Sequence, residues 1–268
     1  MGKKTTISAF AKRYAAKEKL VMITAYDAPG AAMAYNAGID LFLVGDSVAM
    51  TMLGFDSTLP VTMEDMLHHT RAVRRGAPDA FVVFDMPFMS YQCSISEAMH
   101  NAGLAIKQGG ADAVKLEGGA EHKELVRRLT GAGIPVMPHL GLLPQHVQTL
   151  GGYRVSGKGE DAKRLVADAL ELEAAGAFAI VLECVPQETG KMVTEALHIP
   201  TIGIGAGPEC SGQIQVFHDV VGLCGDFIPR HSRRYVDAGS IIRNALAEYA
   251  SDVRSGTFPA PENCFKDK

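Results

Sequence analysis

The chain has 268 residues, of which 47% are hydrophobic, and a formal net charge of −4. This length and apolar content suffice for one large core, because α/β barrels commonly fill about 250 residues as a single domain. The slightly acidic balance excludes the basic surface typical of nucleic-acid-binding proteins. No apolar run approaches the roughly 20 residues that span a bilayer. Five cysteines in no paired pattern, without a recognisable leader, favour a cytoplasmic location.

Short apolar runs alternate along the chain with longer stretches of helical character. Strands that are apolar on both faces and alternate with helices indicate a parallel sheet. About eight such units predict a single (β/α)8 barrel, a TIM barrel, with a doubly wound open sheet as the alternative. The predicted strands are Leu20–Thr24, Leu41–Val44, Ala80–Phe84, Ala113–Leu116, Ile134–Met137, Ala179–Leu182, Thr201–Ile204 and a weaker Asp226–Ile228.

Two further helices fall outside this repeat. Residues 7–17 form an amphipathic pattern that predicts an N-terminal helix capping the bottom of the barrel, and residues 238–255 predict an extra C-terminal helix. No linker composition interrupts the chain, so residues 1–268 are expected to form one barrel domain, with residues 256–268 an extended or flexible tail. The helices expected between strands are Ser96–Gln108, Glu121–Ala132, Ala162–Ala175 and Gln187–Leu197.

Charged residues gather where the predicted strands end. Asp46, Asp85 and Glu117 stand at or just beyond the ends of three successive strands, and Lys115 precedes Glu117 by two residues. Parallel barrel strands all end at one rim, where barrel active sites are found, so these side chains should converge. Residues two apart on a strand point to the same side, which places Lys115 beside Glu117.

Three convergent carboxylates repel one another unless a cation is shared among them. All-oxygen ligation suits a hard divalent cation such as Mg²⁺, which keeps positions open for water or substrate oxygens. We therefore predict a metal site at Asp46, Asp85 and Glu117. The alternative is that each acid caps a helix or lies in a surface loop. Zn²⁺ is disfavoured because no Cys pair has ligand spacing.

Three more polar residues at the same rim suggest roles in a reaction. Glu183 ends an apolar run, where partial desolvation raises a carboxyl pKa and suits a general base; a structural acid is the alternative. Lys115 could neutralise a substrate carboxylate or an enolate, or simply pair with a rim acid. His139 could donate to a substrate oxygen, or it could be a hydrogen-bonded structural residue.

A long segment, residues 143–163, follows the fifth predicted strand and contains four glycines. Long loops without structure of their own are often lids or binding loops. Tyr153, Arg154 and Lys158 would give this one an aromatic and basic face toward a second, anionic substrate; the alternative is a plain surface loop.

Ten stretches of the chain match the motifs of one known family. They are Leu43–Ser47, Asp56–Thr62, His69–Thr70, Val73–Gly76, Asp85–Met89, Val114–Gly119, His139–Leu142, Gly151–Tyr153, Leu182–Pro186 and Ile202–Gly207. Taken together, these stretches resemble the ketopantoate hydroxymethyltransferase family. The resemblance runs from Thr5 to about Pro259, and its motifs are long enough to be specific. One departure is Leu143, where the family often has Thr, and it leaves the proposed ligands untouched.

The resemblance implies a barrel of the phosphoenolpyruvate/pyruvate type and a one-carbon transfer. In that reaction 3-methyl-2-oxobutanoate, 5,10-methylenetetrahydrofolate and water give 2-dehydropantoate and tetrahydrofolate. The family's Mg²⁺ ligands, one ion per subunit, map onto Asp46, Asp85 and Glu117. Its 2-oxo acid contacts match Ser47 and Lys115, and its base matches Glu183. Bacterial members of the family are decamers, so the resemblance implies that this protein is a homo-oligomer with ten subunits.

Two other functions share parts of this pattern. A metal-dependent carbon–carbon lyase or mutase on the same barrel would use the same carboxylates but need no folate site. Such lyases often carry a Cys on a flexible loop, and residues 151–163 contain none. A non-catalytic anion-binding barrel is disfavoured, because binding alone needs no placed base such as Glu183.

Overall fold

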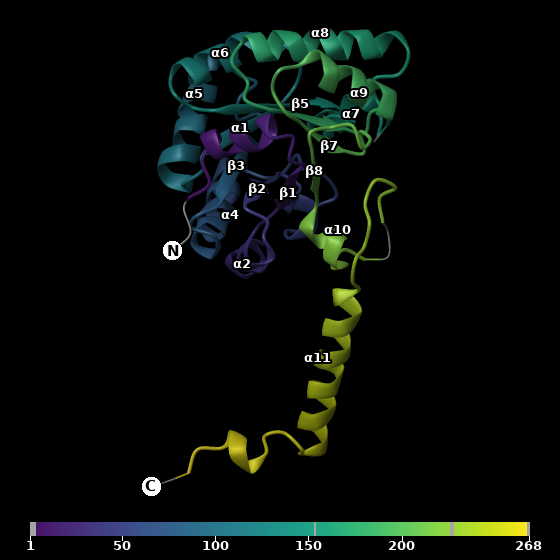
Figure 1. Ribbon diagram of the computed structural model, residues 1–268. Helices are drawn as coiled ribbons and strands as arrows, with labels where there is room; N and C mark the ends of the chain where they lie inside the picture. The colour runs from purple at the N-terminus through teal and green to yellow at the C-terminus, as the bar shows by residue number, and fades with distance from the viewer. Residues whose placement is uncertain (1–3, 153, 226–227, 267–268) are drawn as a thin grey trace. The chain divides into compact units, whose positions relative to one another are not determined.

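The computed structural model describes residues 4–152, 154–225 and 228–266. Two compact units divide the chain, Met1–Phe217 and His218–Lys268. In the first unit, eight parallel strands of the described chain close into a barrel in the order β1 to β8 (Figure 1), which confirms the predicted fold. The strands are β1 Leu20–Thr24, β2 Leu41–Val44, β3 Phe81–Asp85, β4 Ala113–Glu117, β5 Val136–Gly141, β6 Ile180–Glu183, β7 Thr201–Ile204 and β8 Gly212–Gln215.

The eighth strand differs from the sequence prediction. It is β8, Gly212–Gln215, whereas the weak run pointed to Asp226–Ile228, whose first two residues lie outside the described residues. Hydrophobic patterning misses β8 because only Ile214 among its four residues has a large apolar side chain. Gly212 lets the barrel close, since a Cβ there would lie 2.4 Å from the carbonyl oxygen of its partner Leu20.

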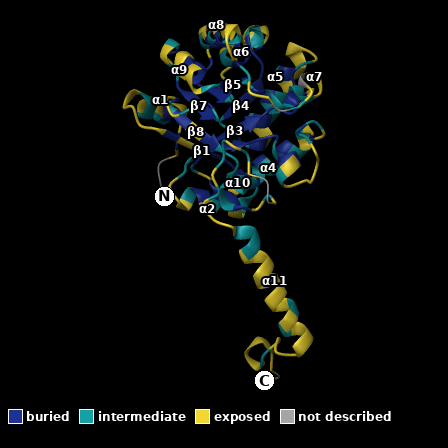
Figure 2. Ribbon diagram, turned by 90° about the vertical axis from the view of Figure 1, so that its right-hand side faces the viewer, coloured by how far each residue is buried: buried dark blue, intermediate teal, exposed yellow. Residues whose placement is uncertain are grey.

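Helices surround the sheet of the first unit. Figure 2 shows the strands buried and the outer helices exposed on the face away from the sheet. α4 begins with a capping box in which Thr62 and Asp65 satisfy each other's main-chain N–H groups. The helical segments of this unit are α1 Ile7–Ala15, α2 Ala28–Asn36, α3 Val48–Thr51, α4 Met63–Gly76, α5 Ile95–Leu104, η1 Ala105–Gly109, η2 Ala120–His122, α6 Lys123–Gly131, η3 Pro144–His146, α7 Val147–Leu150, α8 Glu160–Ala174 and α9 Gln187–Ala196. The short helix α10 Phe217–Val221 starts at the last residue of this unit and belongs otherwise to the second unit.

The N-terminal helix α1 covers the bottom of the barrel, as predicted. Thr6 caps it by accepting a hydrogen bond from the N–H of Ala9. Its residue Phe10 is buried and packs edge-on against Phe178, with ring centroids 5.4 Å apart, and against Phe81 at 6.1 Å. Phe81 begins β3 and Phe178 precedes β6, so Phe10 closes the end of the barrel at which the strands start.

The barrel interior explains how apolar strands come to carry a polar site. Alternate residues of each strand point inward, and those near the strand starts form one apolar core that includes Phe81, Val83, Ala113, Met137 and Val181. Continuing each row by two residues toward the strand ends replaces these apolar side chains with charged or polar ones. The core therefore fills the lower barrel and leaves its upper end to Asp85, Lys115, Glu117, His139 and Glu183.

The second unit contains the predicted C-terminal helix, α11 Ala238–Ser255. Asp237 caps its start by accepting a hydrogen bond from the N–H of Ser240, and Gly256 ends it in the left-handed conformation. A short 3-10 turn, η4 Pro261–Asn263, follows. That residues 1–268 form a single domain with a flexible tail stays a prediction. Across the described residues, none of the helices has the length and apolar content needed to cross a membrane.

Candidate active site

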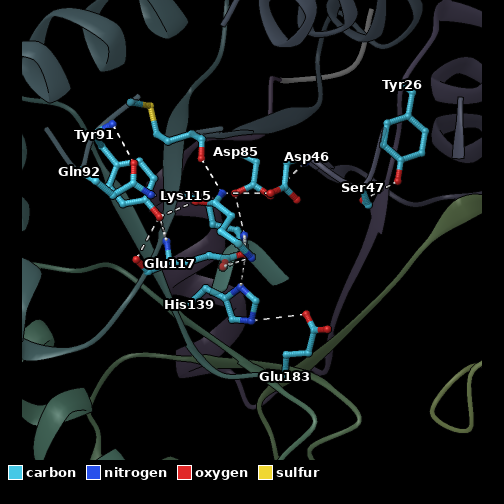
Figure 3. A network of polar contacts seen from close by, with 12 residues as sticks. Tyr26, Asp46, Ser47, Asp85, Tyr91, Gln92, Lys115, Glu117, His139 and Glu183 are labelled. Carbon is cyan, nitrogen blue, oxygen red and sulfur yellow. Dashed lines mark hydrogen bonds and ion pairs between the residues drawn. The ribbon is translucent and has the colours of Figure 1, made fainter. Parts of the chain in front are cut away.

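Strand register brings the predicted site residues together. Asp85 of β3 is the direct partner of Lys115 on β4, and Glu117 is the partner of His139 on β5. Glu183 at the end of β6 pairs with Gly141. Gly141 has φ +100°, and a Cβ there would lie 2.3 Å from the carbonyl oxygen of Glu183, so only glycine allows this approach. Figure 3 shows the resulting network of polar side chains.

Lys115 is the cation at the centre of the carboxylates. Its Nζ lies 2.7 Å from Asp85 Oδ1 and 3.9 Å from Glu117 Oε1, and all three side chains are at most 5% exposed. Asp46 joins them through its main-chain N–H, which donates to Asp85 Oδ2 at 3.2 Å. The predicted convergence of Asp46, Asp85, Lys115 and Glu117 is therefore present in the structure (Figure 3).

Burial raises the pKa values of these carboxyl groups. Desolvation, followed by repulsion from Glu117, raises the pKa of Asp46 to about 6. Desolvation raises the pKa of Asp85 to about 7 even though Lys115 acts against it, and it also raises the pKa of Glu117. Burial lowers the pKa of Lys115, but the surrounding carboxylates, Asp85 first, outweigh it and the pKa is raised. One lysine does not balance so much buried negative charge.

The carboxylates do not form a preassembled metal cage. In the parts of the chain that the structure describes, no group of three or more His, Cys, Asp or Glu side chains is arranged to hold a metal ion. Lys115 occupies Asp85 Oδ1, and the side-chain amide of Gln145 occupies Asp46 Oδ2. However, Glu117 Oε1 is buried without a hydrogen-bond partner among the described residues. An all-oxygen donor set with an unsatisfied buried acceptor has the chemistry that a hard cation requires.

Glu183 lies across His139 from this group. Its Oε2 is 3.4 Å from His139 Nε2, while His139 Nδ1 is 3.6 Å from Glu117 Oε1. Burial, then repulsion from Glu117, raises the pKa of Glu183 to about 8, although 18% of its side chain remains exposed. Burial lowers the pKa of His139 well below its usual value, so the ring is neutral. Glu183 thus combines solvent access with a perturbed pKa, as a proton acceptor requires.

Ser47 lies to one side of the carboxylates, next to a residue that sequence reasoning missed (Figure 3). Its Oγ is 2.9 Å from the hydroxyl of Tyr26, a buried side chain just beyond the end of β1. Burial raises the pKa of Tyr26 to about 12. The position of Tyr26 just after the end of β1 was the sequence feature that could have marked it as a site residue.

Sequence reasoning also missed a buried amide cluster on the other side of the site. Gln145, in η3, is 2% exposed and bonds to Asp46, while Tyr91 and Gln92 lie after β3 and bond to Gln145. Uncharged side chains in loops carry no periodic or charge pattern, so only their contacts reveal them.

The 143–163 segment contains η3 and α7, and its last residues begin α8. Its start bonds to the site through Gln145. Further along, it is held by a bond from Ser156 N to Cys184 O at 3.1 Å and by one from Thr189 Oγ1 to Gly157 O at 2.7 Å. Arg154 and Lys158 are exposed. Tyr153 lies outside the described residues, and the lid role remains a prediction.

A closed parallel barrel with buried carboxyl groups and a lysine at the strand ends has the architecture of a TIM-barrel enzyme. The family model described as Ketopantoate hydroxymethyltransferase matches residues 4–261. The chain belongs to the ketopantoate hydroxymethyltransferase family, and it is a hydroxymethyltransferase. It is 55% identical over 258 residues to "3-methyl-2-oxobutanoate hydroxymethyltransferase" of Thermotoga maritima, covering 96% of this chain and 95% of the relative. The protein of that name from Carboxydothermus hydrogenoformans is 52% identical over 263 residues, covering 98% and 95%.

Solved structures of other enzymes share the fold. A 2,3-dimethylmalate lyase, described as a PEP mutase/isocitrate lyase superfamily member, has TM-score 0.59 and 16% identity, covering 100% of this chain and 92% of that one. A phosphonopyruvate hydrolase in complex with oxalate and Mg²⁺ has TM-score 0.61 and 14% identity, covering 97% and 93%. At such identities the likeness concerns the fold alone. It agrees with the expected phosphoenolpyruvate/pyruvate type of barrel.

Proposed function

We propose that this chain transfers a hydroxymethyl group from 5,10-methylenetetrahydrofolate to 3-methyl-2-oxobutanoate. The products are 2-dehydropantoate and tetrahydrofolate, and the reaction is the first committed step of pantothenate biosynthesis. The family and the names of the relatives support the substrate. The observation that carries the chemistry is Glu183, a partly exposed carboxyl with a raised pKa beside the buried Lys115–carboxylate group.

We propose that Asp46, Asp85 and Glu117 hold one Mg²⁺ per subunit. The raised pKa values of all three, and a Glu117 Oε1 that accepts no hydrogen bond from the described residues, support a site that accepts more positive charge. When bound, such a cation would act as a Lewis acid that polarises the 2-oxo group and eases loss of the neighbouring C3 proton.

Each side chain at the site then has its own role in the proposed reaction. The Glu183 carboxylate accepts the C3 proton, and Lys115, with its raised pKa, stays protonated and stabilises the enolate charge. Ser47, positioned by Tyr26, contacts the 2-oxo acid. Neutral His139, next to Glu183, donates a hydrogen bond to a substrate oxygen.

The proposed reaction balances without an oxidant or reductant. The C3–H bond breaks and a C–C bond forms to the methylene carbon of the folate. Both C–N bonds of that methylene group break, water supplies the hydroxyl group, and the two released nitrogens take one proton from C3 and one from water. By the same family resemblance we propose that the enzyme is a homo-oligomer, a decamer. The unpaired cysteine pattern supports the proposal that it is cytoplasmic.

Proton NMR of 3-methyl-2-oxobutanoate in D₂O tests substrate, cation and base together. With enzyme and Mg²⁺ we expect loss of the C3 proton signal by exchange, and with tetrahydrofolate and formaldehyde we expect product. Glu183→Gln should bind the 2-oxo acid normally but slow exchange by about 10²-fold or more, the usual contribution of a general base. Glu188→Gln, an exposed acid on α9, is the matched control. Exchange at the wild-type rate in Glu183→Gln would assign the base elsewhere.

A further inference from the structure

Gln145 is a neutral side chain with every hydrogen-bonding position engaged beside the carboxylates. Its Nε2 donates to Asp46 Oδ2 and to the carbonyl oxygen of Met86, both at 3.0 Å. Its Oε1 accepts from the hydroxyl of Tyr91 at 2.9 Å and from Gln92 Nε2 at 3.1 Å. An amide has two donor hydrogens and two acceptor lone pairs, so its capacity is filled.

The orientation of this amide follows from its neighbours. A carboxylate and a main-chain carbonyl can only accept, so the NH₂ group must face Asp46 and Met86. The NH₂ group of Gln92 can only donate, so the oxygen of Gln145 must face it. A rotated amide would oppose donors to donors and acceptors to acceptors, which fixes the direction of the bond to Asp46.

The main chain of Gln145 engages a second carboxylate. Its N–H donates to Glu117 Oε2 at 3.0 Å, while Glu117 Oε1 accepts no hydrogen bond from the described residues. One residue therefore binds a single oxygen of Asp46 and a single oxygen of Glu117. The other oxygen of each carboxylate stays outside these bonds.

We infer that Gln145 is the positioning residue for the carboxylate group, and that it sets the affinity of this group for a divalent cation. This inference rests on the proposed Mg²⁺ site. A charged residue at this position would pair with the acids and compete with the cation, whereas an amide orients them and adds no charge. Partners that orient metal-binding carboxylates typically account for about 10- to 100-fold in metal affinity.

Gln145→Met tests the inference, because methionine keeps the length of the side chain and the main-chain bond to Glu117 but removes the amide. Binding of Mg²⁺ alone to the protein without substrate is measured by titration calorimetry, at a temperature where circular dichroism shows the wild type and the variant equally folded. We expect about 10- to 100-fold weaker binding. Gln148→Met, an exposed residue three positions along, is the matched control and should bind as the wild type does.

The possible outcomes separate this inference from the proposed function. If the wild type itself binds no Mg²⁺, the proposed metal site fails. If the wild type binds and folded Gln145→Met binds equally well, the metal site stands and the positioning role is refuted, because a residue that only stabilised the fold would leave affinity unchanged. If Gln145→Met does not fold, Gln92→Met takes its place. It removes one donor to the amide, and unchanged affinity there would overturn the inference.

Discussion

Replacing Lys115 with Met should destabilise the protein in a strongly pH-dependent way. Lys115 is the cation nearest to Asp85, at 2.7 Å, and to Glu117, at 3.9 Å, and all three side chains are buried. Methionine fills nearly the same volume, so packing changes little while the positive charge disappears. Breaking a buried ion pair by removing one partner typically costs about 3–5 kcal/mol, because the remaining charge is uncompensated.

The sign of the pH effect follows from the raised carboxyl pKa. Asp85 has a pKa of about 7 in the folded protein against an ordinary value of 3.8, so between these values the folded state binds more protons than the unfolded state. Stability therefore falls as pH rises through this window. Without Lys115 the pKa of Asp85 rises further, so the fall in stability continues to a higher pH and its total becomes larger. At pH 5 Asp85 is already protonated and therefore neutral, so the positive charge of Lys115 stabilises it little.

Thermal unfolding followed by circular dichroism at pH 5 and pH 8, without divalent cations, measures this effect. At pH 8 the loss of about 3–5 kcal/mol corresponds to a midpoint roughly 6–20 °C lower for a chain of this size. At pH 5 we expect a much smaller shift. Lys123→Met is the control, since Lys123 pairs with Glu171 at 3.0 Å on the exposed surface and should contribute about 0–1 kcal/mol. Equal losses at both pH values in Lys115→Met would refute the reasoning.

Two further predictions concern the reaction itself. Because the pKa of Glu183 is raised to about 8 in the cation-free protein, its basic form accumulates as pH rises, so C3 exchange measured by NMR with saturating Mg²⁺ should increase with pH and then level off. A rate that does not change between pH 6 and pH 9 would contradict this assignment of the base. Asp46→Ala and Asp85→Ala should each abolish turnover by weakening cation-dependent binding of the 2-oxo acid. Their Mg²⁺ and substrate affinities, measured by titration calorimetry, check the cause, and normal turnover in both would exclude the metal site.

Much of the barrel was predictable because seven of its strands are short apolar runs. The observed β1, β2 and β7 have the predicted ends, and the other four differ by one to four residues at an end. Helix α11 also matches its predicted range, because its caps lie in the sequence at Asp237 and Gly256. The prediction of the eighth strand was wrong, because Gly212–Gln215 is recognised only through its pairing with β1 and β7. Such pairing is not a local property of the sequence.

The site residues also fall into a group that the sequence predicts and a group that only the structure reveals. Asp46, Asp85, Lys115, Glu117 and Glu183 were predictable as a group, because charged residues at the ends of successive parallel strands must meet at one rim. The neutral residues that orient them could not be found in this way. Gln145 and Tyr91 reveal their roles only through hydrogen bonds between segments far apart in the sequence.

The sequence left open whether Lys115 pairs with a rim acid, and the structure shows that it does. Patterning predicted that the acids would need a cation, and the structure shows Lys115 already bonded to Asp85 Oδ1, the kind of oxygen that a metal would need. The lysine and a metal thus compete for the same carboxylate, and binding of either reduces the attraction for the other. In Lys115→Met this competition is absent, so Mg²⁺ should restore at pH 8 a large part of the stability that the substitution removes. If Mg²⁺ stabilises wild type and variant equally, the lysine and the cation do not share these carboxylates.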